Sequence, residues 1–399
     1  MIKMIYELKE EDFIKTLPII NELSFNNAVI SIIERKSRGR IWVDDPKNPK
    51  SVFIWDKYQR YFLAGDSNNS NFNQLLVRLF RNEIFPIGIR ESLVQWTFYF
   101  SPNWEERIFK FFKEFYPMKD YRRYYSYNWE RNLAVKQWRE KIPEGFALEQ
   151  MNKEFLKRTD LIGLKGIIDN DLNSWSSLDI YNKYGTGYCL VNTQLNEMAS
   201  WCFGEYASEE GLIIEVGIET NEKYQKKGFA TITGAAFIEY FIAKKHSIGW
   251  HCWETNTGSI KTAEKLGYQF IKKYAVFFGW YNIFDNCIVN GFFATREKDF
   301  KKAIKFYLKG IKLLTKEKSA IKQSHLLKRK GLLAEVYFNL ACAYAQLKKK
   351  KETSKYMEKS LQNGFNDFKK LEEEKNLKNI LNSKKWKNRL SKAIKEKNV

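Results

Sequence analysis

The sequence predicts an α/β (α+β) fold in which two mixed-sheet domains in tandem precede an all-α tail. Strand-like runs rich in β-branched and aromatic residues alternate with helix-like runs over the first 283 residues, and the second part repeats a related order. The tail is set apart by charge, because residues 286–399 hold 30 Lys and Arg against 11 Asp and Glu, while the rest is nearly neutral. We expect domains at 1–135, 143–283 and 286–399.

Turn residues divide the first part into elements. Asp44-Asp45-Pro46 separates two strands, Gly65-Asp66 ends a third, and Pro102 begins a helix. The predicted strands are 40–43, 51–55, 61–64, 95–100 and 124–129, and the predicted helices are 18–36, 71–82 and 102–115.

The second part carries the same kinds of elements and a hairpin around Gln194–Glu197. The predicted strands are 145–150, 187–192, 198–205, 212–220, 247–253 and an aromatic stretch through Tyr281, and the predicted helices are 152–158, 166–175, 229–244 and 257–266. In strand 212–220 a period of two places Glu215 and Glu219 on one face and the apolar residues on the other, which we expect to meet a helix layer.

The most informative loop is Tyr224-Gln225-Lys226-Lys227-Gly228-Phe229-Ala230, between strand 212–220 and helix 229–244. Backbone N–H groups at the start of a helix attract anions, and the helix dipole adds to that attraction. Gly228 permits a tight backbone and the lysines add positive charge. The loop matches neither the P-loop pattern nor the dinucleotide pattern, yet it is suited to hold a pyrophosphate.

Gln225-x-x-Gly228-x-Ala230 after a strand resembles the coenzyme A pyrophosphate loop of the GNAT (Gcn5-related) N-acetyltransferases. Downstream, Asn256 before a helix that ends in Lys265-Leu266-Gly267-Tyr268 is similar to a second motif of that family. The resemblance implies an enzyme of the EC 2.3.1 class that moves an acetyl group from acetyl-CoA to a primary amine of a small molecule, with a peptide amine as the second choice. The first part lacks such a loop, so it looks like a degenerate, non-catalytic copy. This two-part layout resembles the zwittermicin A resistance group, which implies a role in antibiotic resistance or detoxification.

The resemblance also assigns residues to the cofactor. In this family two parallel strands splay apart around the pantetheine arm, and by that likeness they are 212–220 and 247–253. The cofactor-binding residues it implies are Ile218, Glu219, Thr220, Gln225, Lys226, Lys227, Gly228, Phe229, Ala230 and Asn256. Asn256 is also suited to cap the helix that follows it.

Amide formation needs a neutral amine, whereas a free alkylammonium has a pKa of about 10, so a base or desolvation must remove the proton. Glu215 is our predicted catalytic base, with Glu219 and His251 as weaker alternatives and a salt-bridged strand carboxylate as the plain alternative. Many family members carry a Tyr seven residues after the Asn as the acid, but Ala263 stands there. Tyr268 and Tyr274 are near only in sequence, and direct loss of the thiolate is a further alternative.

The tail resembles tetratricopeptide helices in two segments. The matching positions are Gly291, Ala303, Tyr307 and Gly310 in the first and Leu340, Ala341, Tyr344, Thr353, Met357 and Ser360 in the second. The basic charge has three interpretations: a solvated lysine-rich surface, a groove for an acidic protein, or a nucleic-acid surface. No helix-turn-helix, zinc finger or RNP signature supports nucleic-acid binding.

The cysteines and the hydropathy limit which classes of protein remain possible. Five cysteines without paired spacing predict reduced thiols and no metal site. No apolar run reaches the ~18 residues of a membrane span, so we expect a cytoplasmic protein with no membrane contact. The missing Tyr at Ala263 leaves one alternative open: a non-catalytic, acyl-CoA-binding interaction protein whose tail binds a partner.

Overall fold

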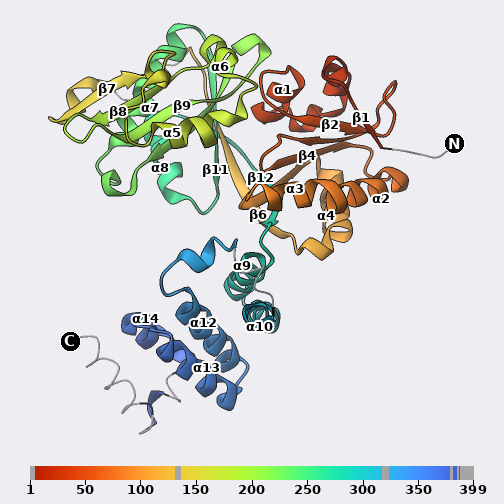
Figure 1. The fold of residues 1–399 in the computed structure, drawn as a ribbon, viewed down its shortest axis with the longest axis vertical. Coiled ribbons are helices and arrows are strands. Elements are labelled where there is room, and N and C mark those ends of the chain that lie inside the picture. Colours follow the sequence, from red (N-terminus) through yellow and green to blue (C-terminus); the bar gives the residue numbers. More distant parts are fainter. Residues whose placement is uncertain (1–4, 131–135, 317–322, 378–380, 384–385, 387–399) are drawn as a thin grey trace. The chain divides into compact units, whose positions relative to one another are not determined.

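The computed structural model describes residues 5–130, 136–316, 323–377, 381–383 and 386 (Figure 1). Twelve strands form one sheet. In chain order they are β1 (Tyr6–Glu7), β2 (Arg40–Val43), β3 (Ser51–Trp55), β4 (Arg60–Gly65), β5 (Gln95–Phe100), β6 (Met118–Tyr127), β7 (Phe146–Gln150), β8 (Gly187–Asn192), β9 (Glu197–Ser208), β10 (Ile213–Thr220), β11 (Ser247–Trp253) and β12 (Gln269–Trp280).

The helices begin and end where the sequence offers caps. Asn69, Ser177, Asn256 and Asn282 accept backbone N–H groups at the starts of α2, α6, α8 and α9. The helices are α1 (Asn27–Ile33), α2 (Ser70–Leu79), α3 (Phe85–Arg90), α4 (Glu105–Phe111), α5 (Leu164–Gly166), α6 (Leu178–Tyr184), α7 (Phe229–Ala243), α8 (Thr257–Leu266), α9 (Ile283–Arg296), α10 (Phe300–Lys316), α12 (Leu332–Gln346), α13 (Lys350–Gln362) and α14 (Phe368–Glu373).

The two halves of the sheet exchange their last strands. The strand order is β1-β2-β3-β4-β5-β12-β6-β11-β10-β9-β8-β7 (Figure 1). Strand β12, from the second half, lies between β5 and β6 of the first half, and β6 in turn pairs with β11 of the second half. The mixed α/β fold is therefore confirmed, but the halves share one sheet.

Most predicted strands and the longer helices of the second half are present within a residue or two. The helix predicted at 18–36 is wrong in its first part: residues 10–19 and 21–23 are 3-10 turns, and α1 begins only after the capping Asn26. Pro18 and the polar residues that follow it explain the delay, because proline and asparagine disfavour a helix interior. The helix predicted at 152–158 is only a 3-10 turn at Phe155–Lys157. The helix predicted at 166–175 is present as consecutive α, π and 3-10 turns over residues 164–174, and α6 was not predicted.

Two helices sandwich the central strands of the second half. Helix α7, apolar on nearly all sides, packs against β8, β9, β10 and β11. Ile214 and Val216 of β10 join this core, as the strand period predicts. Helix α1 covers the other face of β9 and β10, where the side chain of Asn27 accepts a hydrogen bond from Ser208 Oγ at 3.0 Å.

The chain divides into two compact units. One comprises Met1–Glu83 and Trp96–Phe278, and the other comprises Ile84–Gln95 and Gly279–Val399. The second unit holds the pairs α9–α10 and α12–α13 around a core that includes Phe338 and Trp386. Its helical nature agrees with the prediction, whereas the tetratricopeptide likeness and the three-domain division stay predictions. In the ranges that the structure describes, no helix is both long and apolar enough to cross a membrane.

Candidate active site

Strands β10 and β11 form a fork. They pair in parallel at Ile213–Ser247, Ile214–Ile248 and Glu215–Gly249, and the pairing ends there. Beyond that point β10 stays paired with β9 as far as Thr220, and β11 stays paired with β6 as far as Trp253. The facing edges of β10 and β11 therefore diverge and leave their backbone N–H and C=O groups available to a ligand between them.

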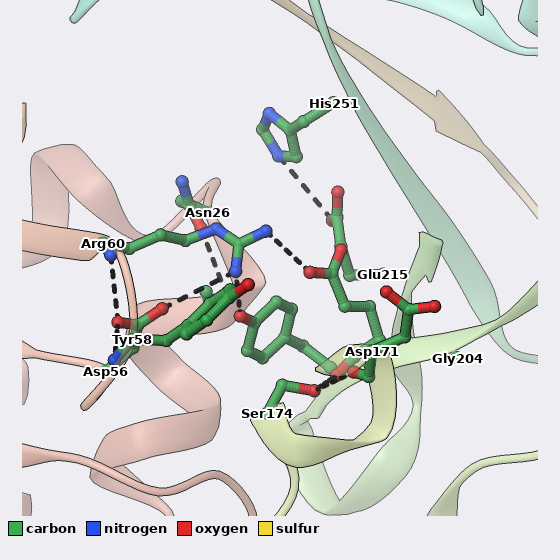
Figure 2. A network of polar contacts seen from close by, with 12 residues as sticks. Asn26, Asp56, Tyr58, Arg60, Asp171, Ser174, Gly204, Glu215 and His251 are labelled. Atoms are coloured by element: carbon green, nitrogen blue, oxygen red, sulfur yellow. Dashed lines mark hydrogen bonds and ion pairs between the residues drawn. The ribbon is translucent and has the colours of Figure 1, made fainter. Parts of the chain in front are cut away.

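A bulge in β9 bends the strand next to the fork. Glu215 and Val216 face Tyr206 and Gly204, so Glu205 is an extra residue without a partner on β10. The segment before α6 holds the bulge in place. Trp175 Nε1 donates to Gly204 O at 2.9 Å. Ser174 Oγ donates to Glu205 O at 3.0 Å (Figure 2).

A cavity of about 550 Å³ opens between the diverging strands, the loop before α7, and α8. Its lining residues are Ile218, Glu219, Thr220, Tyr224, Gln225, Lys226, Gly228, Phe229, Ala230, Thr231, Trp250, Asn256, Gly258, Ser259, Lys261, Thr262 and Lys265. Nine of the ten sequence-predicted cofactor residues lie here, and Lys227 alone is absent from the lining. Their contact with a cofactor stays a prediction.

The loop before α7 presents a row of unused backbone donors. Among the described residues, no protein acceptor takes the N–H groups of Lys226, Lys227, Gly228, Phe229 or Ala230. Gly228 has a φ of 83°, in the left-handed region, and a Cβ built on it would meet nothing within 4 Å. Backbone conformation therefore favours glycine here, and the surrounding space is open to a phosphate group.

Asn256 caps a helix, as predicted, and lies in the lining of the cavity. Its Oδ1 accepts the N–H of Ser259 at 3.0 Å and so caps α8, while the residue also lines the cavity. Ser259 Oγ in turn accepts the indole N–H of Trp250 at 3.0 Å. These contacts fix the wall of the fork opposite β10.

A second cavity of about 280 Å³ continues from the first along the fork. The two share Ile218, Glu219, Trp250, Asn256 and Ser259. The second cavity is further lined by Arg122, Asp171, Trp201, Phe203, Glu205, Val216, Gly217, His251, Cys252 and Trp253. A ligand in the first cavity would thus end beside this second cavity, which we call the chamber.

Three carboxylates line this chamber, and their environments differ. Burial, aided by the negative charges of Glu219 and Glu205, raises the pKa of Asp171 to about 7. Glu205 is ion-paired, because Arg60 Nη2 donates to its Oε1 at 2.6 Å. Arg60 also contacts Tyr206 and lies 3.6 Å from Asp56 Oδ2, so the first half of the chain supports the chamber (Figure 2).

Glu215, the predicted base, lies outside both linings. The residue is 5% exposed, and its Oε2 lies close to Gly249, where an added Cβ would also come within 3.3 Å of Asn27 Nδ2 of α1. Its Oε2 lies 3.6 Å from Nε2 of His251, which does line the chamber (Figure 2). Burial raises the pKa of Glu215 well above its usual value and lowers the pKa of His251 well below its own. Burial therefore disfavours the charged form of each group.

No predicted acid lies at the fork. Ala263 is fully buried on the inner face of α8, and Tyr268 is buried against Trp250. The hydroxyl of Tyr274 hydrogen-bonds to His251 Nδ1 at 2.8 Å. Neither tyrosine is among the lining residues of these two cavities.

Sequence reasoning missed Asp171, Glu205 and Arg122. Asp171 ends a one-turn π-helical segment, Glu205 is the bulged residue of β9, and Arg122 lies in the exchanged strand β6. No local sequence motif joins these three positions. All five cysteines are buried and free. Within the part of the chain that the structure describes, no three His, Cys, Asp or Glu side chains come together to hold a metal ion.

Comparison with known proteins places this chain in a family. An uncharacterized N-acetyltransferase of Bacillus subtilis, YdfB, is 21% identical over 280 residues, which cover 69% of this chain and 98% of that protein. The solved GCN5-related N-acetyltransferase-like protein from Streptococcus suis is 16% identical and covers 68% of this chain and 98% of that one, with a TM-score of 0.49. A tandem GNAT protein from the clavulanic acid biosynthesis pathway is 9% identical over 69% of this chain and 98% of its own, with a TM-score of 0.45. The family described as GNAT acetyltransferase matches residues 18–277, which is more than half of the sequence. The chain therefore belongs to the GNAT acetyltransferase family.

Proposed function

We propose that this protein transfers an acetyl group from acetyl-CoA to a primary amine of a small molecule. One observation carries the proposal. The fork between β10 and β11 opens into a cavity that ends at the start of α7, where no described acceptor takes the five backbone N–H groups of residues 226–230. Such a row of donors suits a pyrophosphate, and free strand edges suit the amides of a pantetheine arm. Acetyl-CoA, when bound, supplies the acetyl group as a thioester.

The chain's own residues then have distinct tasks. The backbone of Ile218, Glu219 and Thr220 would pair with the extended arm, and the loop from Gln225 to Ala230 would hold the phosphates. Trp250 and Asn256, which line both cavities, would border the thioester end. The acceptor amine would occupy the 280 Å³ chamber beside it.

Asp171 is our preferred acceptor for the proton of the amine. It lines the chamber, and a carboxylate with a pKa of about 7 is matched to proton transfer near neutral pH. Glu215 stays a second proposal, because it reaches the chamber only through His251 and burial raises its pKa. The two proposals are separated by comparing the pH dependence of kcat in the variants Asp171→Asn and Glu215→Gln.

A dedicated acid is not required by this arrangement. The buried Ala263 leaves no side chain at the position where many relatives carry tyrosine. A thiol with a pKa of about 8.5 leaves as a thiolate at moderate cost and takes its proton from water.

Two measurements test the proposal. Calorimetry of the full chain with acetyl-CoA should detect binding, and incubation with acetyl-CoA and a panel of primary amines should release free CoA. Absence of any affinity for acetyl-CoA would defeat the proposal. Binding without turnover of any amine would instead favour the acyl-CoA-binding interaction protein.

For the tail we propose tetratricopeptide-like helix pairs that bind an acidic protein. Close packing supports the pairs, because a Cβ on Gly291 would lie 2.4 Å from the ring of Tyr307 and one on Gly310 would lie 2.7 Å from Ile288. Tyr344 and Tyr356 stack at 5.4 Å, and Lys355 and Lys359 lie over the Tyr356 ring. Capture of an acidic partner by the full chain that survives moderate salt supports the proposal, and loss of all binding with salt indicates nonspecific attraction.

A further inference from the structure

We propose that the acceptor is an amine that also carries a carboxylate, of the amino-acid class, and that Arg122 binds this carboxylate. The inference rests on the proposed function, because it takes the 280 Å³ chamber as the acceptor site of acetyl transfer. It narrows the acceptor from any primary amine to a compact zwitterion.

Arg122 is a cation of the chamber without an anionic partner. Its Nη1 donates to Tyr99 Oη at 3.0 Å and its Nη2 donates to His251 O at 3.4 Å. Its Nε is buried and makes no hydrogen bond. Among the described residues, no carboxylate oxygen lies within 4.0 Å of the guanidinium.

Two neighbouring arginines each have a carboxylate partner, and Arg122 differs from them in this respect. Arg123, the next residue of β6, forms a two-pronged pair with Glu254 at 2.9 and 2.7 Å. Arg60 pairs with Glu205 at 2.6 Å. A partly buried guanidinium without a counter-charge is costly, and a carboxylate from a ligand would meet its fork geometry and offset that cost.

The indole of Trp201 belongs to the same chamber, where the residue is 8% exposed. Its N–H interacts with the Asp171 carboxylate and lowers the pKa of that group. Arg122, which lines the chamber and has no carboxylate oxygen within 4.0 Å among the described residues, is therefore the group that suits a ligand with acceptor oxygens.

The other side of the chamber suits the ammonium end of the same ligand. Glu205 is already paired with Arg60, which leaves Asp171 and Glu219 without a cationic partner among the described residues. A polyamine would place a further positive charge near Arg122, which repels it. At about 280 Å³ the chamber falls below the range of drug-sized pockets, so the acceptor is compact.

The test compares matched pairs of acceptors that differ only in the carboxylate. The full chain with acetyl-CoA is assayed on ornithine and putrescine, lysine and cadaverine, histidine and histamine, and serine and ethanolamine. We expect kcat/KM to favour the carboxylate-bearing member of the best pair at least tenfold. Equal or better acetylation of the plain amines overturns the inference. The inference is also overturned if none of the four amino acids is acetylated.

Variants tie the preference to the guanidinium. Arg122→Gln should reduce the within-pair ratio to about one, by raising KM for the amino acid much more than KM for the plain amine. Arg122→Lys keeps the charge without the fork and should give an intermediate ratio. The matched control Arg123→Gln removes a paired arginine that lines neither cavity, and the ratio should stay at the wild-type value. A ratio unchanged by both Arg122 variants overturns the inference. Failure of the proposed function looks different, because then acetyl-CoA itself neither binds nor yields CoA with any amine.

Discussion

The pKa of Asp171 gives a sharp kinetic prediction. Burial is the largest cause of its upward shift, followed by the charges of Glu219 and Glu205, and the pKa is about 7. A base acts only when it is deprotonated, so kcat should fall as the pH drops through 7 and the carboxylate takes up its proton. Asp171 is about 10% ionised at pH 6, half ionised at pH 7 and about 90% ionised at pH 8.

The expected change in kcat between pH 6 and pH 8 is therefore about tenfold. An ordinary aspartate, with a pKa of about 3.9, would be almost fully ionised throughout this range and would leave kcat flat. The contrast is large enough to decide whether the chamber environment acts on the catalytic base.

The assay measures product by chromatography at saturating acetyl-CoA and amine from pH 5.5 to 8.5. Asp171→Asn should lower kcat about a hundredfold and abolish the rise around pH 7. Glu219→Gln removes the larger of the two charge effects, so the rise should move to lower pH. An unchanged rise in Asp171→Asn, with its loss in Glu215→Gln, would refute the reasoning and assign the proton to Glu215.

Two further predictions use glycines with matched controls. Gly228→Ala and Gly331→Ala place the same methyl group on left-handed backbones with open surroundings, so each should lower the free energy of unfolding by about 1 kcal/mol in urea titrations. Only Gly228→Ala should weaken acetyl-CoA binding in calorimetry, by at least fivefold, and equal affinities for the two variants would contradict the phosphate-loop proposal. Gly249→Ala would bring a Cβ to 2.4 Å from Glu215 Oε2 and should lower the free energy of unfolding by about 1–3 kcal/mol. Gly166→Ala, whose Cβ meets nothing within 4 Å, should be neutral or slightly stabilising, and a larger loss there than at Gly249 would count against the packing argument.

Local signals in the sequence were enough for the strands, the helix and the loop that surround the fork, while the fork itself was expected from the family resemblance. Strand β11 and helix α8 have the predicted bounds, because the helix is capped by Asn256 and ended by Gly267 with a φ of 93°. Such caps and turns are encoded within a few residues, so they can be identified without knowing the rest of the fold.

The chamber could not be predicted, because its parts meet only through tertiary contacts. The period of β10 placed Glu215 on the correct face but did not reveal what covers that face. The cover is α1, whose Asn27 bonds to Ser208 across 181 residues of sequence. Asp171 lies in a short irregular segment, and Arg122 reaches the site through the pairing of β6 with β11.

The exchange of β6 and β12 makes each half structurally dependent on the other. A polypeptide cut between them would leave the first fragment without the neighbour that separates β5 from β6, and the second fragment without the strand that flanks β11. Neither fragment alone would have a closed set of backbone partners, so edges would be exposed to aggregation. The two fragments should regain the native sheet only by associating, and a single continuous chain avoids that concentration-dependent step.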